Sequence, residues 1–204
     1  MKIRLTVTVV LGLLLGTAIG VYAATALETI KAPIDEIVTI LKDPQYQDGA
    51  RKDQQQAQLW PIIHQIFDFN LISRIALTRN NWKKFTPEQR KAFTNAFTGL
   101  LKNTYVDKMQ GGDFKDVSVV FIEENKLSEK KSQVSSKIIS REKELSVSYS
   151  LRLKKNRWRI YEVEVEDVRL IKNYREQFNR TLKTSSPAEL IQQIEKKVAQ
   201  RDKQ

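Results

Sequence analysis

The sequence predicts an α+β fold in which a curled antiparallel four-stranded sheet packs against several helices. Three features of the chain predict it: apolar residues recur at helical spacing up to about residue 110, alternate with polar residues from 116 to 165, and then return to helical spacing. Alternation with a period of two is typical of strands that bury one face. Helices on either side of one such sheet give an α+β arrangement.

The helical segments have recognisable starts and stops. Thr86 is predicted to be an N-cap, with Pro87 at the first helical position and Gln89 completing a capping box. Gly111-Gly112 ends that helix, and Pro61 starts or kinks an earlier one. The predicted helices cover residues 27–42, about 59–67, 71–77, 87–109, 168–182 and 187–198.

The strand segments are joined by short polar turns, as in an antiparallel meander. The predicted strands cover residues 117–121, 134–138, 145–153 and 158–165. In the last of them the alternation slips, because Trp158 and Ile160 share one phase while Tyr161, Val163 and Val165 share the other. A slip of this kind predicts a β-bulge, which bends a strand and curls the sheet.

Residues 1–26 have the three parts of a secretory signal peptide. A basic start with Lys2 and Arg4 precedes an apolar run over 5–21, and the small residues that follow suit cleavage after Ala23 or Ala26. An uncleaved membrane anchor is the alternative, because an apolar run of roughly 17 residues is at the lower limit for spanning a bilayer. We expect a signal peptide over 1–26, a single domain over 27–204 and a location in the cell envelope.

The chain is strongly basic, with a formal net charge of +11. Residues 126–157 alone hold ten Lys or Arg against three Glu. A basic face attracts polyanions, and a solvated face with no specific role is the alternative. With an export signal, anionic lipid surfaces and acidic proteins are favoured over nucleic acid, for which the chain has no binding module.

Candidate catalytic residues are few. Glu162, Glu164 and Glu166 alternate along a predicted strand, so their side chains project from one face about 6.8 Å apart, a spacing that a glycosidase pair uses. The alternative is a solvated face on which these acids pair with Arg152 and Lys154 of the neighbouring strand. No nucleophile elbow or phosphate loop occurs in the sequence.

Candidate metal ligands are equally few. The chain has no cysteine, which excludes disulfides, thiolate metal sites and lipid attachment at a cysteine. His64 is the only histidine and lies in an apolar helical segment, so we expect a structural role. No metal and no cofactor are predicted.

Two blocks of sequence resemble one known family. The first is Trp82-Lys-Lys-Phe-Thr86-Pro87-Glu88-Gln89-Arg90 followed by Phe93, Phe97, Leu101 and Tyr105; the second is Tyr161-Glu162-Val163 with Glu166 to Leu170, then Asn173-Tyr174-Arg175, Gln177 and Phe178. In this order they resemble the periplasmic phospholipid-binding proteins of the Mla lipid-transport system, the MlaC or toluene-tolerance family. The resemblance spans about residues 60–198.

The chain departs from the family pattern at two turns. Family glycines are absent near Arg79 and Asp167, and a family serine is absent near Arg169. Asn80 and Asn81 are expected to take over the first turn, because asparagine adopts positive φ more readily than most residues. A divergent branch that handles another lipid, such as a hopanoid, is therefore an alternative.

The resemblance implies a cystatin-like or NTF2-like fold whose sheet and helices enclose an apolar lipid pocket. An apolar stripe looks the same when it packs against itself, so a plain core is the alternative. The residues expected to bind lipid are Trp82, Phe93, Phe97, Leu101, Tyr105, Val147, Tyr149, Leu151, Val163, Val165, Leu170, Tyr174 and Phe178.

The resemblance also implies a function and partners. It predicts a soluble, monomeric carrier for phospholipid without enzymatic activity. The expected partners are an inner-membrane ABC transporter with an MCE-domain ring and an outer-membrane lipoprotein–porin complex. By shuttling phospholipid between them, the carrier would maintain outer-membrane lipid asymmetry. Two alternatives come from other classes. One is an NTF2-like enzyme for a small molecule, and the other is a ligand-free adaptor that binds a protein through its basic face.

Overall fold

The computed structural model describes residues 24–201 apart from 48, 111, 113 and 142. Most of the predicted signal peptide therefore lies outside the described residues. The helices are α1 Ala26–Lys42, the 3-10 turn η1 Pro44–Tyr46, α2 Lys52–Ile66, α3 Phe69–Ala76, α4 Thr78–Lys84, α5 Pro87–Gln110, α6 Leu170–Thr181 and α7 Pro187–Arg201. The strands are β1 Ser118–Ser128, β2 Lys131–Ile139, β3 Glu144–Lys154, β4 Arg157–Val165 and β5 Val168–Arg169.

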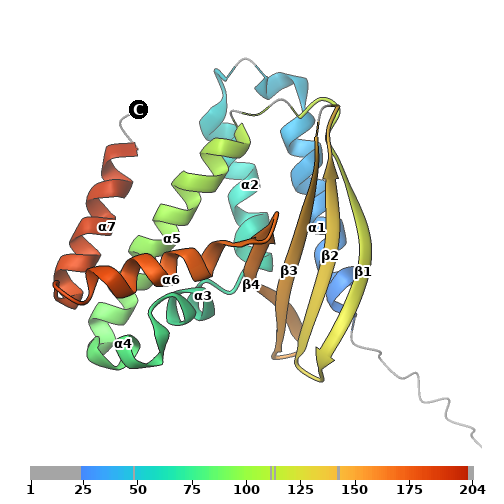
Figure 1. Ribbon diagram of the computed structural model, residues 1–204. Helices are drawn as coiled ribbons and strands as arrows, with labels where there is room; N and C mark the ends of the chain where they lie inside the picture. The colour runs from blue at the N-terminus through green and yellow to red at the C-terminus, as the bar shows by residue number, and fades with distance from the viewer. Residues whose placement is uncertain (1–23, 48, 111, 113, 142, 202–204) are drawn as a thin grey trace, which may run out of the picture.

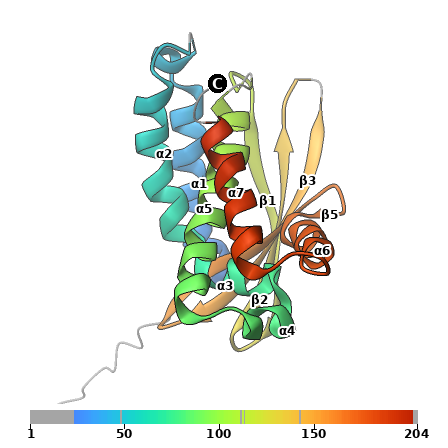
Figure 2. The same ribbon diagram turned by 90° about the vertical axis from the view of Figure 1, so that its left-hand side faces the viewer.

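The strands form one antiparallel sheet in the order β1-β2-β3-β4-β5, which confirms the α+β class. Helices gather on one side of this curved sheet, and α7 lies farthest from it (Figures 1 and 2). Helices α1, α2 and α3 contact the sheet, and α5 packs against α2, α3 and α7. Among the described helices none is long and apolar enough to cross a membrane.

The fifth strand was not predicted. Its two residues pair with the end of β4, so Arg169 lies opposite Glu164 and Val168 opposite Val165. The chain reverses between the two strands at Glu166 and Asp167, whose φ angles are 48° and 64°. The helix predicted from Val168 therefore begins two residues later, at Leu170.

The predicted bulge in β4 is confirmed. Ser150 of β3 lies opposite Glu162, whereas Leu151 lies opposite Ile160, which leaves Tyr161 as the extra residue. In a regular strand Ile160 and Val163, which are three residues apart, would face opposite sides of the sheet, because side chains alternate along a strand. The bulge lets both parts of β4 direct their apolar residues to the helix-covered face.

The first helix begins at Ala26, within the segment expected to be leader. Thr25 and Glu28 form a capping box, and Ala26 is fully buried. The indole Nε1 of Trp158 donates to the carbonyl of Ala24 over 3.0 Å, and the Glu124 carboxylate accepts from the backbone N–H of Leu27 at 2.8 Å. The fold therefore uses residues 24–26, and a division between 26 and 27 stays a prediction.

Two details of the helical half differ from expectation. Helix α2 starts at Lys52 and contains Pro61, so Pro61 does not start the helix, and a kink at Pro61 stays a prediction. The positive φ expected at Asn80 or Asn81 occurs at Thr78, with φ 62°, and both asparagines are helical. The α3–α4 junction therefore places a β-branched residue in the left-handed region, where it is strained.

Candidate functional site

A cavity of about 260 Å³ lies between the sheet and helices α2, α3 and α5. The sheet wall is apolar, and Val147 and Tyr149 lie there directly opposite Val165 and Val163 of the next strand. The helices supply most of the other wall. The full lining is Trp60, Ile63, Phe67, Phe69, Ile72, Leu101, Lys102, Tyr105, Val106, Met109, Ile138, Val147, Tyr149, Tyr161, Glu162, Val163, Val165, Leu170 and Ile171.

The edge of β4 opens onto this cavity. Two separate segments form backbone contacts with this edge. Asp68 donates its N–H to the carbonyl of Ile160 over 2.9 Å, and Val168 of β5 pairs with Val165. Tyr161 and Val163, which lie between these contacts, line the cavity. The bulge at Tyr161 is thus part of the wall.

Several predicted lipid-binding residues line this cavity. They are Leu101, Tyr105, Val147, Tyr149, Val163, Val165 and Leu170. Because these come from α5, β3, β4 and the start of α6, the structure gathers four elements that the sequence left separate.

The other predicted residues lie elsewhere. Phe93, Phe97, Tyr174 and Phe178 pack on one another, with ring centroids 5.0 to 5.8 Å apart. Leu151 is fully buried in the core. Trp82 lies on α4 with Arg90 over its ring at 5.5 Å.

A second, larger cavity of about 480 Å³ lies between α5, α6 and α7. Tyr174 and Phe178 reach it, but Gln177, Gln193 and Lys197 give its lining a polar character. The smaller apolar cavity is therefore the better site for an apolar ligand.

The sequence reasoning missed the wall formed by α2 and α3. Trp60, Ile63 and Phe67 follow one another at helical spacing, and Phe69 packs on both Trp60 and Phe67, with centroids 5.5 and 6.0 Å away. Their spacing predicts an apolar helix face. It carries no signal that separates a cavity wall from ordinary core.

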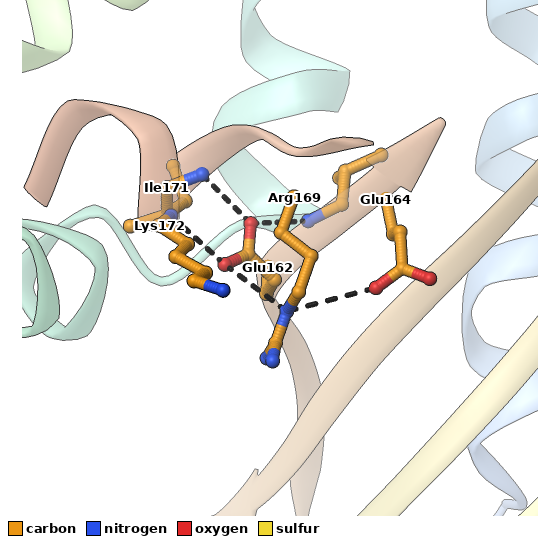
Figure 3. Close-up of polar contacts among 6 residues, drawn as sticks. Glu162, Glu164, Arg169, Ile171 and Lys172 are labelled. Carbon is orange, nitrogen blue, oxygen red and sulfur yellow. Dashed lines mark hydrogen bonds and ion pairs between the residues drawn. The ribbon is translucent and has the colours of Figure 1, made fainter. Parts of the chain in front are cut away.

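Glu162 does not lie on a solvated face as expected. It is only 4% exposed, and its carboxylate accepts from the backbone N–H of Ile171 at 2.8 Å and of Lys172 at 3.2 Å (Figure 3). The bulge places Glu162 and Glu164 opposite serines of β3, away from Arg152 and Lys154.

The acids of β4 instead hold the start of α6. Arg169 Nε lies 3.9 Å from Glu162 Oε2 and 3.6 Å from Glu164 Oε2. A carboxylate at a helix N-terminus satisfies unpaired N–H groups and interacts favourably with the helix dipole. Glu162 is thereby engaged in fixing α6 at the cavity wall.

Tyr105 and Tyr149, two of the three tyrosines that line the cavity, are neutral at physiological pH. Burial raises the pKa of the Tyr105 phenol, and the neighbouring Tyr174 and Glu162 add to the rise. Burial also raises the pKa of Tyr149. Neither phenol is poised to act as a base near neutral pH.

No metal site was found in the part of the chain that the structure describes. His64 is exposed on α2, with its ring centroid 6.0 Å from that of Trp60 and 5.5 Å from that of Phe69. It packs against aromatic rings and does not line the cavity.

Comparison with known proteins identifies the family. The family model described as MlaC protein matches residues 31–196. This chain belongs to the MlaC family. No curated protein matches it in sequence.

A solved structure shares the MlaC fold of this chain. It is the phospholipid-binding protein from Ralstonia solanacearum in complex with a phospholipid, which is 24% identical in sequence with a TM-score of 0.77. The match covers 88% of this chain and 99% of that one.

Proposed function

We propose that this MlaC-family protein is a soluble periplasmic carrier that binds phospholipid acyl chains in the cavity between the sheet and α2, α3 and α5. The observation that carries the proposal is the apolar lining of that cavity, to which strands and helices both contribute. The phospholipid complex of the Ralstonia solanacearum protein, which has the same fold, supports it.

The need for a carrier follows from the hydrophobic effect. Each methylene exposed to water is unfavourable by about 0.8 kcal/mol, so two chains of roughly 15 methylenes oppose free transfer by on the order of 20 kcal/mol. An apolar cavity removes most of this barrier, and the polar head group can stay in water. A binding protein of this kind needs no catalytic group.

Loading requires the cavity to widen. Its volume of about 260 Å³ is slightly below the ~300–1,000 Å³ of common small-molecule pockets. The half-buried residues Trp60, Tyr105 and Met109 lie along one wall. We expect α2 and α5 to move away from the sheet as the acyl chains enter.

The proposed route runs between an inner-membrane ABC transporter with an MCE-domain ring and an outer-membrane lipoprotein–porin complex, as in the Mla system. The basic segment 126–157 would dock on an acidic partner or anionic membrane and speed association. Lys126 already pairs with Glu129 and Lys137 with Glu144, so the exposed Lys130 and Lys131 are better candidates for docking.

The binding proposal is tested by mass spectrometry of an organic extract of the purified protein. We expect diacyl phospholipid in about equimolar amount, and a hopanoid cargo would appear in the same spectrum. Protein from several expression hosts that yields no lipid would exclude the carrier function. It would favour the enzyme or the adaptor.

The docking proposal is tested separately by transfer kinetics between vesicles that carry the purified partner complexes. Lys130→Glu with Lys131→Glu should slow delivery while leaving the amount of bound lipid unchanged. The difference in transfer rate between the wild type and this double variant should shrink as added salt reduces the screening length below about 8 Å. Equal rates across the salt series would mean that these lysines are only solvated.

A further inference from the structure

Two charged side chains, Lys102 and Glu162, line the otherwise apolar cavity. The two side chains differ in their hydrogen-bond and ion-pair partners. Glu162 accepts from backbone N–H groups at the start of α6 and lies near Arg169. Among the residues that the structure describes, Lys102 has no such set of partners.

Lys102 is half-buried on α5, next to the cavity residue Leu101. Its Nζ lies 5.7 Å from the ring centroid of Trp60, which also lines the cavity. Within the described ranges no carboxylate is near enough to Lys102 for an ion pair. An ammonium group has three N–H donors and attracts an anion as a point charge, and the contact with the face of Trp60 leaves these donors available.

The Trp60 indole, which lies under the Lys102 ammonium group, is itself packed against other rings. Trp60 packs at 5.5 Å on Phe69 and at 6.0 Å on His64, both measured between ring centroids. The ammonium therefore lies beside a fixed aromatic wall and is partly shielded from water, which strengthens its attraction for an anion.

We propose that Lys102 is the phosphate-binding residue of the carrier, and that its Nζ binds the phosphate of a glycerophospholipid whose acyl chains fill the cavity. This inference rests on the proposed lipid-binding function. It predicts discrimination between lipids with and without a phosphate and little discrimination between the groups beyond the phosphate, because those groups extend into water.

The test uses delipidated full-length mature protein and vesicles that contain equal amounts of dioleoyl phosphatidic acid and dioleoylglycerol, whose acyl chains are identical. Lipid recovered with the re-isolated protein is quantified by mass spectrometry. The wild type should prefer phosphatidic acid. Lys102→Met keeps an apolar side chain of similar length without the charge and should reduce the preference roughly ten- to a hundred-fold, the range expected for loss of a charge-assisted hydrogen bond.

Two matched variants test whether the preference depends on a positive charge at position 102 or only on the overall charge of α5. Lys102→Arg should retain the preference, and Lys91→Met should leave it unchanged, because Lys91 is exposed on the same helix and does not line the cavity. Circular dichroism on each variant confirms that it is folded. An excess of inorganic phosphate should not remove the preference.

The outcomes are distinguishable. If the wild type recovers neither lipid, the proposed carrier function fails and this inference fails with it. If both lipids are recovered in the same ratio by the wild type and Lys102→Met, the carrier function stands and the role of Lys102 is refuted. A preference abolished by inorganic phosphate would assign Lys102 to the free anion and overturn its role in lipid recognition.

Discussion

One row of side chains across the sheet offers a stringent test of the cavity. Val134, Tyr149 and Val163 lie side by side on β2, β3 and β4. Val163 is half-buried and lines the cavity, whereas Val134 is fully buried and does not. The same substitution to glutamate at both valines compares a cavity wall with closed core in one structural context.

The two substitutions should differ in their effect on folding. At Val134 a carboxylate would be sealed from water, so we expect unfolding to become easier by about 3 kcal/mol or more. At Val163 the carboxylate can hydrate through the cavity. There the loss should be close to the transfer term of a partly exposed valine, about 1–2 kcal/mol.

The substitution at Val163, which has the smaller effect on folding, should have the larger effect on lipid binding. In Val163→Glu, acyl chains beside the introduced carboxylate would strip water from its charge, and a penalty of about 3 kcal/mol corresponds to roughly a hundred-fold weaker binding. Urea denaturation measures the first effect, and the lipid content of purified protein measures the second. The assignment of this cavity as the lipid site would be refuted by either of two results. One is that Val163→Glu loses as much stability as Val134→Glu, and the other is that Val163→Glu retains as much lipid as the wild type.

Three further predictions concern local features. Thr78→Gly should stabilise the fold by about 1 kcal/mol in urea denaturation, because Thr78 is held at positive φ; a loss of stability would contradict the strain. A chain that begins at Leu27 should be about 2 kcal/mol less stable than one that begins at Ala24, since it lacks the Thr25 cap and the carbonyl that accepts from Trp158; equal stability would show that residues 24–26 are dispensable. Although burial opposes it, hydrogen bonds from Leu27, Ala26 and other groups lower the pKa of Glu124, so its stabilisation is present above about pH 4.5 and is lost as pH falls through the folded-state pKa. Glu124→Gln should therefore be less stable than wild type near pH 7, with a difference that narrows in acid, and a difference independent of pH would contradict this.

The sheet could be predicted from sequence because its signal is local. Alternation identified the first four strands, and the change of phase after Ile160 located the bulge. The fifth strand escaped prediction because two residues are too few to show a period. It depends on the reversal at Glu166 and Asp167.

The cavity could be predicted only in part because apolar stripes do not show what they face. Phe97 and Leu101 lie one turn apart on α5, yet Phe97 packs on Tyr174 and Phe178 while Leu101 lines the cavity. Glu162 was misplaced for a related reason. Its environment depends on the β3–β4 register and on the position of α6, which are set by contacts between distant parts of the chain.

The extra residue at Tyr161 makes the wall of the cavity sensitive to the number of residues in β4. A regular strand with the same residues would turn either the Trp158–Ile160 pair or the Val163–Val165 pair away from the helices, whereas deleting Tyr161 itself would keep both pairs on the helix side and remove only the bulge. A residue inserted or deleted at another position between Trp158 and Val165 would turn the residues on one side of it to the other face of the sheet. Among related sequences, substitutions along β4 should therefore be far more common than insertions or deletions of a single residue outside the bulge.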